Sequence, residues 1–110
     1  MTDNVSVSVK FAGKLRNLAS VDRDGIKQTV RELVNRRGRV INKGALSLDI
    51  TQNSHKFRQT PLFLCRARLW NNGKKVIAIG EEYGIGQTVD RALNKIEQQL
   101  IQYKERKLGV

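Results

Sequence analysis

The chain has 110 residues and a formal net charge of +11, because 21 lysines and arginines stand against 10 aspartates and glutamates. This length fits one domain, residues 1–110, and no linker or repeat divides it. No apolar run approaches the roughly 18 residues that span a bilayer, and the start of the chain lacks the apolar block of a secretory signal. A single cysteine and a single histidine exclude an internal disulfide and a His/Cys metal cluster. We therefore expect a cytoplasmic, reduced, non-membrane protein with a polyanionic partner.

A strand and a helix are the first two predicted elements. Apolar and polar residues alternate from Val5 to Phe11, which predicts a half-buried strand. Apolar residues then recur at helical spacing from Ile26 to Val34, which predicts an amphipathic helix. We expect Asp22 or Asp24 to cap this helix and its end to lie near Gly38.

Three strands and a second helix follow. Period-two alternation predicts strands at 46–50, 62–70 and 75–79. A polar loop, 52–61, separates the first of these from the second. Asn72 and Gly73 both tolerate positive φ, so they predict a two-residue type I′ hairpin between the last two strands. From about residue 85 to Tyr103 apolar residues recur at spacings of three and four, which predicts the longest helix.

The element order is therefore β-α-β-β-β-α. Short connections between the later strands favour antiparallel pairing, and each helix has one apolar stripe to bury. The sequence predicts an α+β fold with a four-stranded, mainly antiparallel sheet and both helices on one of its faces.

Basic residues concentrate on the outward faces of both predicted helices. On the last helix two arginines and a lysine form a stripe with two glutamines opposite the apolar side, consisting of Arg91, Lys95, Gln98, Gln102 and Arg106. Those of the first helix are Lys27, Arg31, Arg36, Arg37 and Arg39. Long donors at near four-residue spacing can bond successive phosphates. A merely solvated face would mix both signs of charge, so we interpret the two stripes as nucleic-acid-binding surfaces.

Structured RNA is the polyanion that the pattern favours. Readers of double-stranded DNA usually insert a helix from a helix-turn-helix or zinc module, and neither is visible. The strands lack the paired aromatic signature of an RRM, so stacking of single-stranded bases is the less favoured RNA mode. One competing surface stays open, because Lys10, Arg66 and Arg68 could make the uncovered face of the sheet basic.

Little in the chain favours catalysis. Cys65 shares a strand face with apolar residues, so we expect a buried structural thiol, and His55 lies in a polar loop. Gly80, Gly84 and Gly86 lack the spacing of a nucleotide-binding turn, and we interpret them as loop residues that need positive φ. We expect no enzyme activity, no cofactor, no metal and no small-molecule substrate. A thiol enzyme that uses Cys65 is the third and weakest class of function.

The stretch Thr88–Lys104 resembles the final helix of the ribosome hibernation promoting factors, also called ribosome-associated translation inhibitors. In that family the helix typically reads A-I-D-x-x-x-D-K-L-E-R-Q-L-x-K-Y-K. Lys95 matches the family's lysine, whereas Gln98 and Gln102 stand where Arg or Lys is usual. The β-α-β-β-β-α order also matches over nearly the whole chain, as does the hairpin before the segment Ala78–Glu81. The implied fold is similar to that of double-stranded-RNA-binding domains.

The resemblance implies a non-enzymatic inhibitor that occupies the small ribosomal subunit where messenger and transfer RNA bind. Such a protein blocks translation and preserves idle ribosomes under stress or in stationary phase, and basic side chains on both helices face ribosomal RNA. Because the chain stops at Val110, it resembles the short forms. Still open are ribosome dimerisation, with a separate dimerising factor as a further partner, and the oligomeric state. The alternative is a generic structured-RNA-binding domain, such as a ribosome assembly or regulatory protein.

Overall fold

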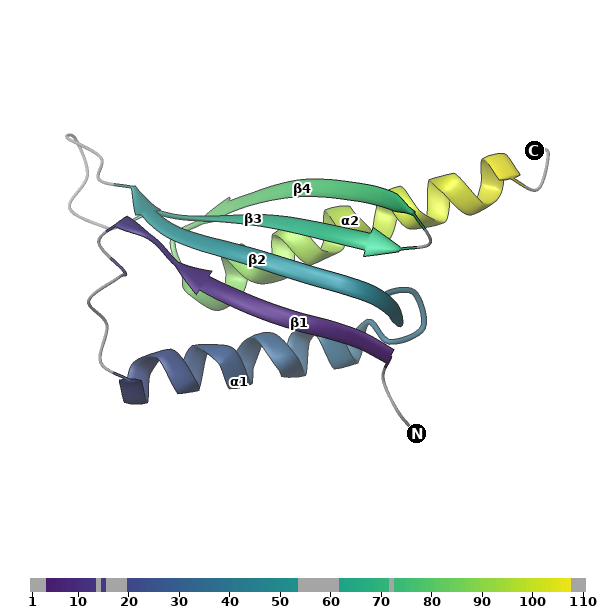
Figure 1. The fold of residues 1–110 in the computed structure, drawn as a ribbon. Coiled ribbons are helices and arrows are strands. Elements are labelled where there is room, and N and C mark those ends of the chain that lie inside the picture. Colours follow the sequence, from purple (N-terminus) through teal and green to yellow (C-terminus); the bar gives the residue numbers. More distant parts are fainter. Residues whose placement is uncertain (1–3, 14, 16–19, 54–61, 72, 108–110) are drawn as a thin grey trace.

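The fold comes from a computed structural model that describes residues 4–13, 15, 20–53, 62–71 and 73–107. Its elements follow the predicted β-α-β-β-β-α order (Figure 1). They are β1 (Asn4–Phe11), α1 (Ser20–Arg36), β2 (Lys43–Asn53), β3 (Leu62–Asn71), β4 (Lys74–Glu82) and α2 (Ile85–Lys107).

The four strands form one sheet in the order β1-β2-β3-β4. The β1–β2 pair is parallel, and the other two pairs are antiparallel. A parallel pair needs a crossover connection, which α1 provides. Asn71 pairs with Lys74 across the β3–β4 hairpin, and Gly73 has a φ of 77°, as a two-residue primed turn requires. Asn72, the other predicted turn residue, lies outside the described residues.

Both helices pack on the same face of the sheet, as predicted. Figure 1 shows α1 running beneath β1 and α2 behind β3 and β4. The core lies between these two layers, and burial of each of its large aliphatic side chains contributes about 1.5–3 kcal/mol. Its largest fully buried members include Ile41, Leu46, Leu48, Ile50, Leu69, Leu93 and Ile96. Neither α1 nor α2 covers the opposite face of the sheet, which leaves the described part of the molecule with two chemically different sides.

Close packing fixes α2 against β4. A Cβ atom on Gly80 would lie 2.5 Å from the carbonyl oxygen of Thr88 and 2.7 Å from the backbone nitrogen of Ala92. The fully buried Thr88 hydroxyl donates to the carbonyl of Gly84 at 2.6 Å. Among the described glycines, positive φ occurs only at 13, 44 and 73, so the expectation of positive φ at 80, 84 and 86 was wrong. Close approach of two backbones explains Gly80 instead.

Several element boundaries differ from the sequence expectation, among them the start of α1 and both ends of β2 and β4. Helix α1 begins at Ser20, so Asp22 lies in its first turn, where a carboxylate favours the helix dipole, and does not cap it. Strand β2 continues to Asn53, because Gln52 pairs with Phe63 on β3, so the predicted loop starts later. The remainder of that loop, 54–61, lies outside the described residues.

Candidate nucleic-acid interface

The α1 side carries exposed cations without internal partners. The side chains of Lys27 and Arg31 project from the helix into solvent, and that of Arg36 does so at its last residue. Arg39 is also exposed, but it lies in the turn after α1 and not on the helix, contrary to the prediction. None of the four forms an ion pair with another described residue. These cations are therefore available to an external anion.

Arg37 has a different role from its neighbours. It too lies in the turn after α1, and its side chain is only 16% exposed. Its Nη2 atom lies 2.7 Å from Oδ1 of Asp90, and its Nη1 atom lies 3.0 Å from Oε1 of Glu97. Both carboxylates belong to α2, so the planar guanidinium joins the two helices through charge-assisted hydrogen bonds. The stripe that the sequence predicted on the first helix thus contains one residue that is already committed inside the protein.

On α2, one row of side chains lies along the outer edge of β4. Arg91 forms an ion pair with Glu82, and Lys95 Nζ donates to the carbonyl of Ile79 at 2.8 Å. One turn later, Gln99 donates to the carbonyl of Ile77 at 2.9 Å. Four residues of a helix rise about 6 Å, and two residues of a strand rise about 6.6 Å. Side chains one turn apart on α2 therefore reach carbonyls two residues apart on β4. This row covers the outer edge of β4, which would otherwise offer free carbonyls to another strand.

The predicted stripe on the last helix therefore divides into two groups. Arg91 and Lys95 are exposed but turned toward β4, whereas Gln98 and Gln102 are exposed without a side-chain hydrogen bond to another described residue. Arg106 lies within α2, and its side chain is outside the described ones. Asp90 and Glu97 face α1 on the other flank of α2. The structure thus does not join the cations of the two helices into one continuous stripe.

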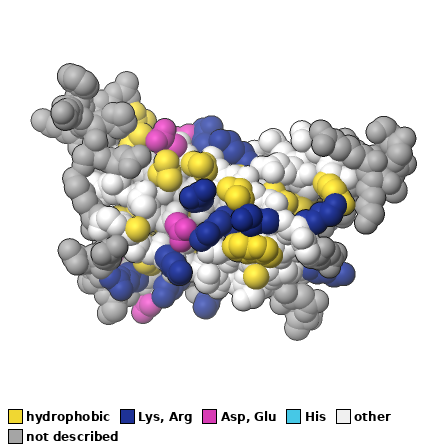
Figure 2. Space-filling view, turned by 45° about the horizontal axis from the view of Figure 1, so that its top comes forward, with side chains coloured by type: hydrophobic (Ala, Val, Ile, Leu, Met, Phe, Trp, Pro, Cys, Tyr) yellow, Lys and Arg dark blue, Asp and Glu magenta, His cyan; other side chains and the backbone are white. Residues whose placement is uncertain are grey.

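The open face of the sheet is the second cationic surface. Figure 2 shows dark-blue and yellow side chains side by side over the middle of this face. Arg68 Nη2 lies 3.0 Å from Oδ2 of Asp49, and Arg66 is exposed with no ion pair to a described residue. The Trp70 ring has the Arg68 guanidinium carbon and Lys75 Nζ each 5.7 Å from its centroid.

Trp70 and Lys75 are the functional candidates that the sequence reasoning missed. The signal was present, because a two-residue hairpin at Asn72 and Gly73 places Trp70 directly opposite Lys75. The alternation of β3 also puts Arg66 and Arg68 on the same face as the ring. The cluster was not predicted because its residues come from two neighbouring strands and form no pattern along either one.

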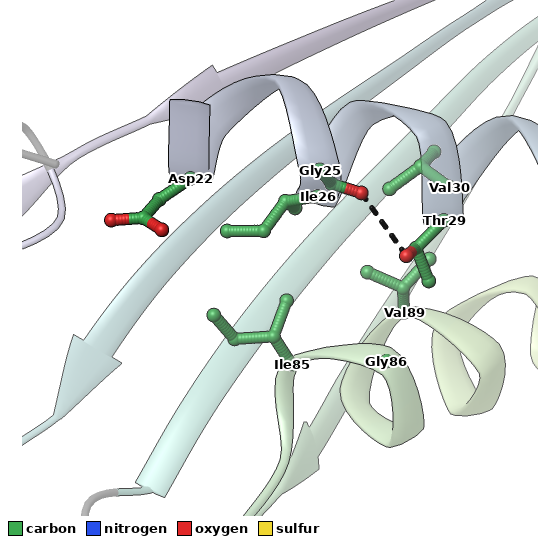
Figure 3. A pocket seen from close by; sticks show the side chains of 8 residues that line it. All are labelled: Asp22, Gly25, Ile26, Thr29, Val30, Ile85, Gly86 and Val89. Carbon is green, nitrogen blue, oxygen red and sulfur yellow. Dashed lines mark hydrogen bonds between the residues drawn. The ribbon is translucent and has the colours of Figure 1, made fainter. Parts of the chain in front are cut away.

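A groove also lies between the N-terminal halves of the two helices (Figure 3). It has a volume of about 610 Å³, and its walls include Ile26 and Val30 from α1 and Ile85 and Val89 from α2. Thr29 turns its hydroxyl to the carbonyl of Gly25 at 3.1 Å, so it offers no free donor to the groove. The lining holds no lysine or arginine, so this groove does not extend the cationic surfaces.

The candidate nucleophile, Cys65, lies in the core of the domain. Cys65 is fully buried, and burial, with a smaller effect from Asp49, raises the pKa of its thiol to about 12. A neutral buried thiol is a poor nucleophile, which removes the argument for a thiol enzyme. Within the described part of the chain no group of three His, Cys, Asp or Glu residues could hold a metal, and His55 lies outside it. No described helix is long and apolar enough to cross a membrane.

Comparison with known proteins identifies the family. Residues 8–109 match the sequence model of the hibernation factor Hib, C-terminal domain. The chain belongs to this family. The hibernation-factor resemblance of the last helix is therefore confirmed. No match to a curated protein was found.

Solved structures support the fold of this hibernation-factor domain. A ribosomal subunit interface protein from Coxiella burnetii superposes with a TM-score of 0.59 at 16% identity, covering 91% of this chain and 98% of that one. The N-terminal domain of Protein Y from Thermus thermophilus gives a TM-score of 0.55 at 15% identity, covering 89% and 98%. At these identities the two likenesses establish the fold alone, and they confirm the predicted α+β architecture.

Proposed function

We propose that this hibernation-factor domain binds the small ribosomal subunit at its messenger and transfer RNA sites and inhibits translation there. It acts in the cytoplasm, under stress or in stationary phase, by occupying the site and not by catalysis. Family membership supports the hibernation role. The name of one structural neighbour, a ribosomal subunit interface protein, agrees with a ribosomal partner.

The α1 side supplies the observation that carries this proposal. Lys27 and Arg31 lie one turn apart and are exposed, and Arg36 at the last residue of the helix and Arg39 in the turn after it are exposed as well. Ribosomal RNA offers a dense array of phosphates, and cations without internal partners lose no internal ion pair when they bind it. Gln98 and Gln102 add donors from α2 to the proposed surface, together with Arg91 and Lys95, which are exposed although they also bind Glu82 and the carbonyl of Ile79. Arg37 is left out of it, because two carboxylates hold its guanidinium and its side chain is only 16% exposed.

The experiment is co-sedimentation with purified small and large ribosomal subunits on sucrose gradients. The test variant is Lys27→Glu with Arg31→Glu, because neither side chain has an ion-pair partner among the described residues. Each lost hydrogen bond to a charged group costs about 1.5 kcal/mol, so we expect affinity for small subunits to fall about a hundredfold. Circular dichroism should show an unchanged fold, because both side chains are exposed.

The matched control is Lys43→Glu with Lys74→Glu, which changes the net charge equally. Lys43 opens β2 and Lys74 opens β4; both are exposed and neither lies on α1, and Lys74 is in contact with Tyr103 of α2. This control should still pellet with small subunits. An equal loss of small-subunit affinity in both variants would show that net charge alone drives binding. Binding of isolated duplex RNA as tightly as intact subunits would favour the generic RNA-binding alternative.

A further inference from the structure

We propose that the open sheet face is a second nucleic-acid site, which binds single-stranded RNA by stacking a base on Trp70. The site is defined by Trp70, Lys75, Arg66, Ile77 and Ile79. It lies on the side of the sheet opposite both helices, so it is separate from the surface proposed for ribosome binding and does not depend on it.

Trp70 presents an exposed aromatic ring on this face of the sheet. Indole is the largest aromatic side chain, and its apolar ring gains free energy when it is covered. Here 41% of the residue is exposed, on the face of the sheet opposite α1 and α2. Stacking on an aromatic ring is the general way in which proteins hold unpaired bases, because every base has a π face.

Two cations, the Arg68 guanidinium and the Lys75 ammonium, lie over the Trp70 ring. Lys75 lies across the hairpin from Trp70, with its Nζ atom 5.7 Å from the ring centroid. Arg66 lies four residues back along β3, about 13 Å from the ring at the usual rise of a strand. Asp49 is paired with Arg66 in the strand register, yet its carboxylate binds Arg68 instead. Arg66 is therefore left to meet a phosphate of a strand that runs along β3.

The aliphatic neighbours complete the site. Ile77 is 37% exposed and Ile79 is 45% exposed, and they lie opposite Arg68 and Arg66 on the adjacent strand. Their side chains give the sugar and base edges of a splayed strand an apolar surface beside the stacked base. A base-paired duplex cannot use this surface, because its base faces are already stacked inside the helix. The mixture of ring, aliphatic side chains and cations thus matches a single strand and not a duplex.

Trp70 also makes the test specific, because it is the only tryptophan in the chain. The wild-type protein is titrated with short oligouridylate and oligoadenylate while tryptophan fluorescence is followed. We expect saturable quenching by both single strands. A duplex of the same length and polyglutamate are the comparison probes, and they should quench much less.

Three substitutions assign the contacts, with binding followed by anisotropy of a labelled oligonucleotide. Trp70→Ala should weaken binding about tenfold, and Trp70→Phe, which keeps a ring, should recover part of the loss. Lys75→Ala should lower the slope of log affinity against log salt by about 0.7, the value for one phosphate on a single strand. The charge-matched control is Lys74→Ala, because Lys74 Nζ lies 3.5 Å from the ring centroid of Tyr103 on α2 and faces away from the site. Its slope should match the wild type.

Two results would overturn the proposal. One is quenching by polyglutamate or by the duplex that equals quenching by the single strands, which would show an acidic protein partner or general polyanion attraction. The other is an unchanged oligonucleotide affinity in folded Trp70→Ala. Loss of small-subunit binding in the Lys27/Arg31 variant concerns the helix side alone, so the two proposals fail separately.

Discussion

The helix side and the open sheet face of this protein both carry cations, but they hold them in different surroundings. On the helix side, Lys27 and Arg31 stand on one exposed row, with no large exposed apolar side chain among the α1 residues that the structure describes. On the sheet face, Arg66 and Lys75 alternate across the hairpin with Ile79 and Trp70. The first surface suits phosphate contact alone, and the second suits phosphate together with exposed bases.

The difference arises from how each element buries its apolar residues. On α1 the single apolar stripe faces the core, so the outer face of this helix is polar among the residues that the structure describes. A strand alternates, and β3 and β4 carry apolar residues on both faces of the sheet. A net charge of +11 does not reveal this distinction, because it counts both surfaces alike.

Cys65 provides the largest predicted effect, because it lies in the buried layer between the two surfaces. At pH 8, iodoacetamide should label it about a thousandfold more slowly in the folded protein than in urea, since a pKa of about 12 leaves little thiolate. The pKa of the Cys65 thiol in the folded protein lies above its ordinary value of 9.0, so the stability that the protonated thiol contributes is complete below pH 9. It is lost as pH rises from 9 toward 12. Rapid labelling in native buffer would mean that the layer opens and that the two surfaces are not independent.

Gly80 tests whether both surfaces depend on the fit of α2 against β4. Gly80→Val places a Cβ into the backbone of α2, so we expect the free energy of unfolding in urea to fall by about 3 kcal/mol. The control is Gly25→Ala in the middle of α1, where no atom lies within 4 Å of the added Cβ. That change should raise stability by about 0.5–1 kcal/mol. A well-tolerated Gly80→Val would show that α2 can move away from the sheet.

Arg37 gives the smallest predicted effect, and it distinguishes a structural contact from an RNA contact on the helix side. Arg37→Ala removes the contacts to Asp90 and Glu97, and we expect the free energy of unfolding to fall by about 2 kcal/mol. A double-mutant cycle with Glu97→Gln should show coupling between the two positions. Affinity of the folded protein for small subunits should not change. The opposite pattern, unchanged stability with weakened binding, would make Arg37 an RNA contact like its neighbours.

Much of the fold could be predicted because its signals are local. The alternation from Val5 to Phe11 and the apolar stripe of the last helix are periodic patterns, and Asn72–Gly73 is a turn signal within two residues. The predicted element order, the single helix-covered face and the buried Cys65 are all confirmed. Boundaries moved where strand pairing extended an element, as in β2.

The site was less predictable because its decisive contacts join distant segments. Nothing near Arg37 in the sequence indicates that it meets carboxylates on the last helix. Likewise, a helical wheel puts Arg91 and Lys95 on the outer stripe, but only the packing of α2 turns them toward the edge of β4. Gly80 shows the same limit, since a close approach of two backbones leaves no local pattern.

Competition with transfer RNA is the most direct test of the central claim. Labelled transfer RNA is bound to small subunits carrying messenger RNA, and rising amounts of the protein are added. We expect the wild type to release the transfer RNA, and the control Lys43→Glu with Lys74→Glu to do the same. The variant Lys27→Glu with Arg31→Glu should leave the transfer RNA bound. Wild-type protein that co-sediments with the subunit while the transfer RNA stays bound would contradict the central claim.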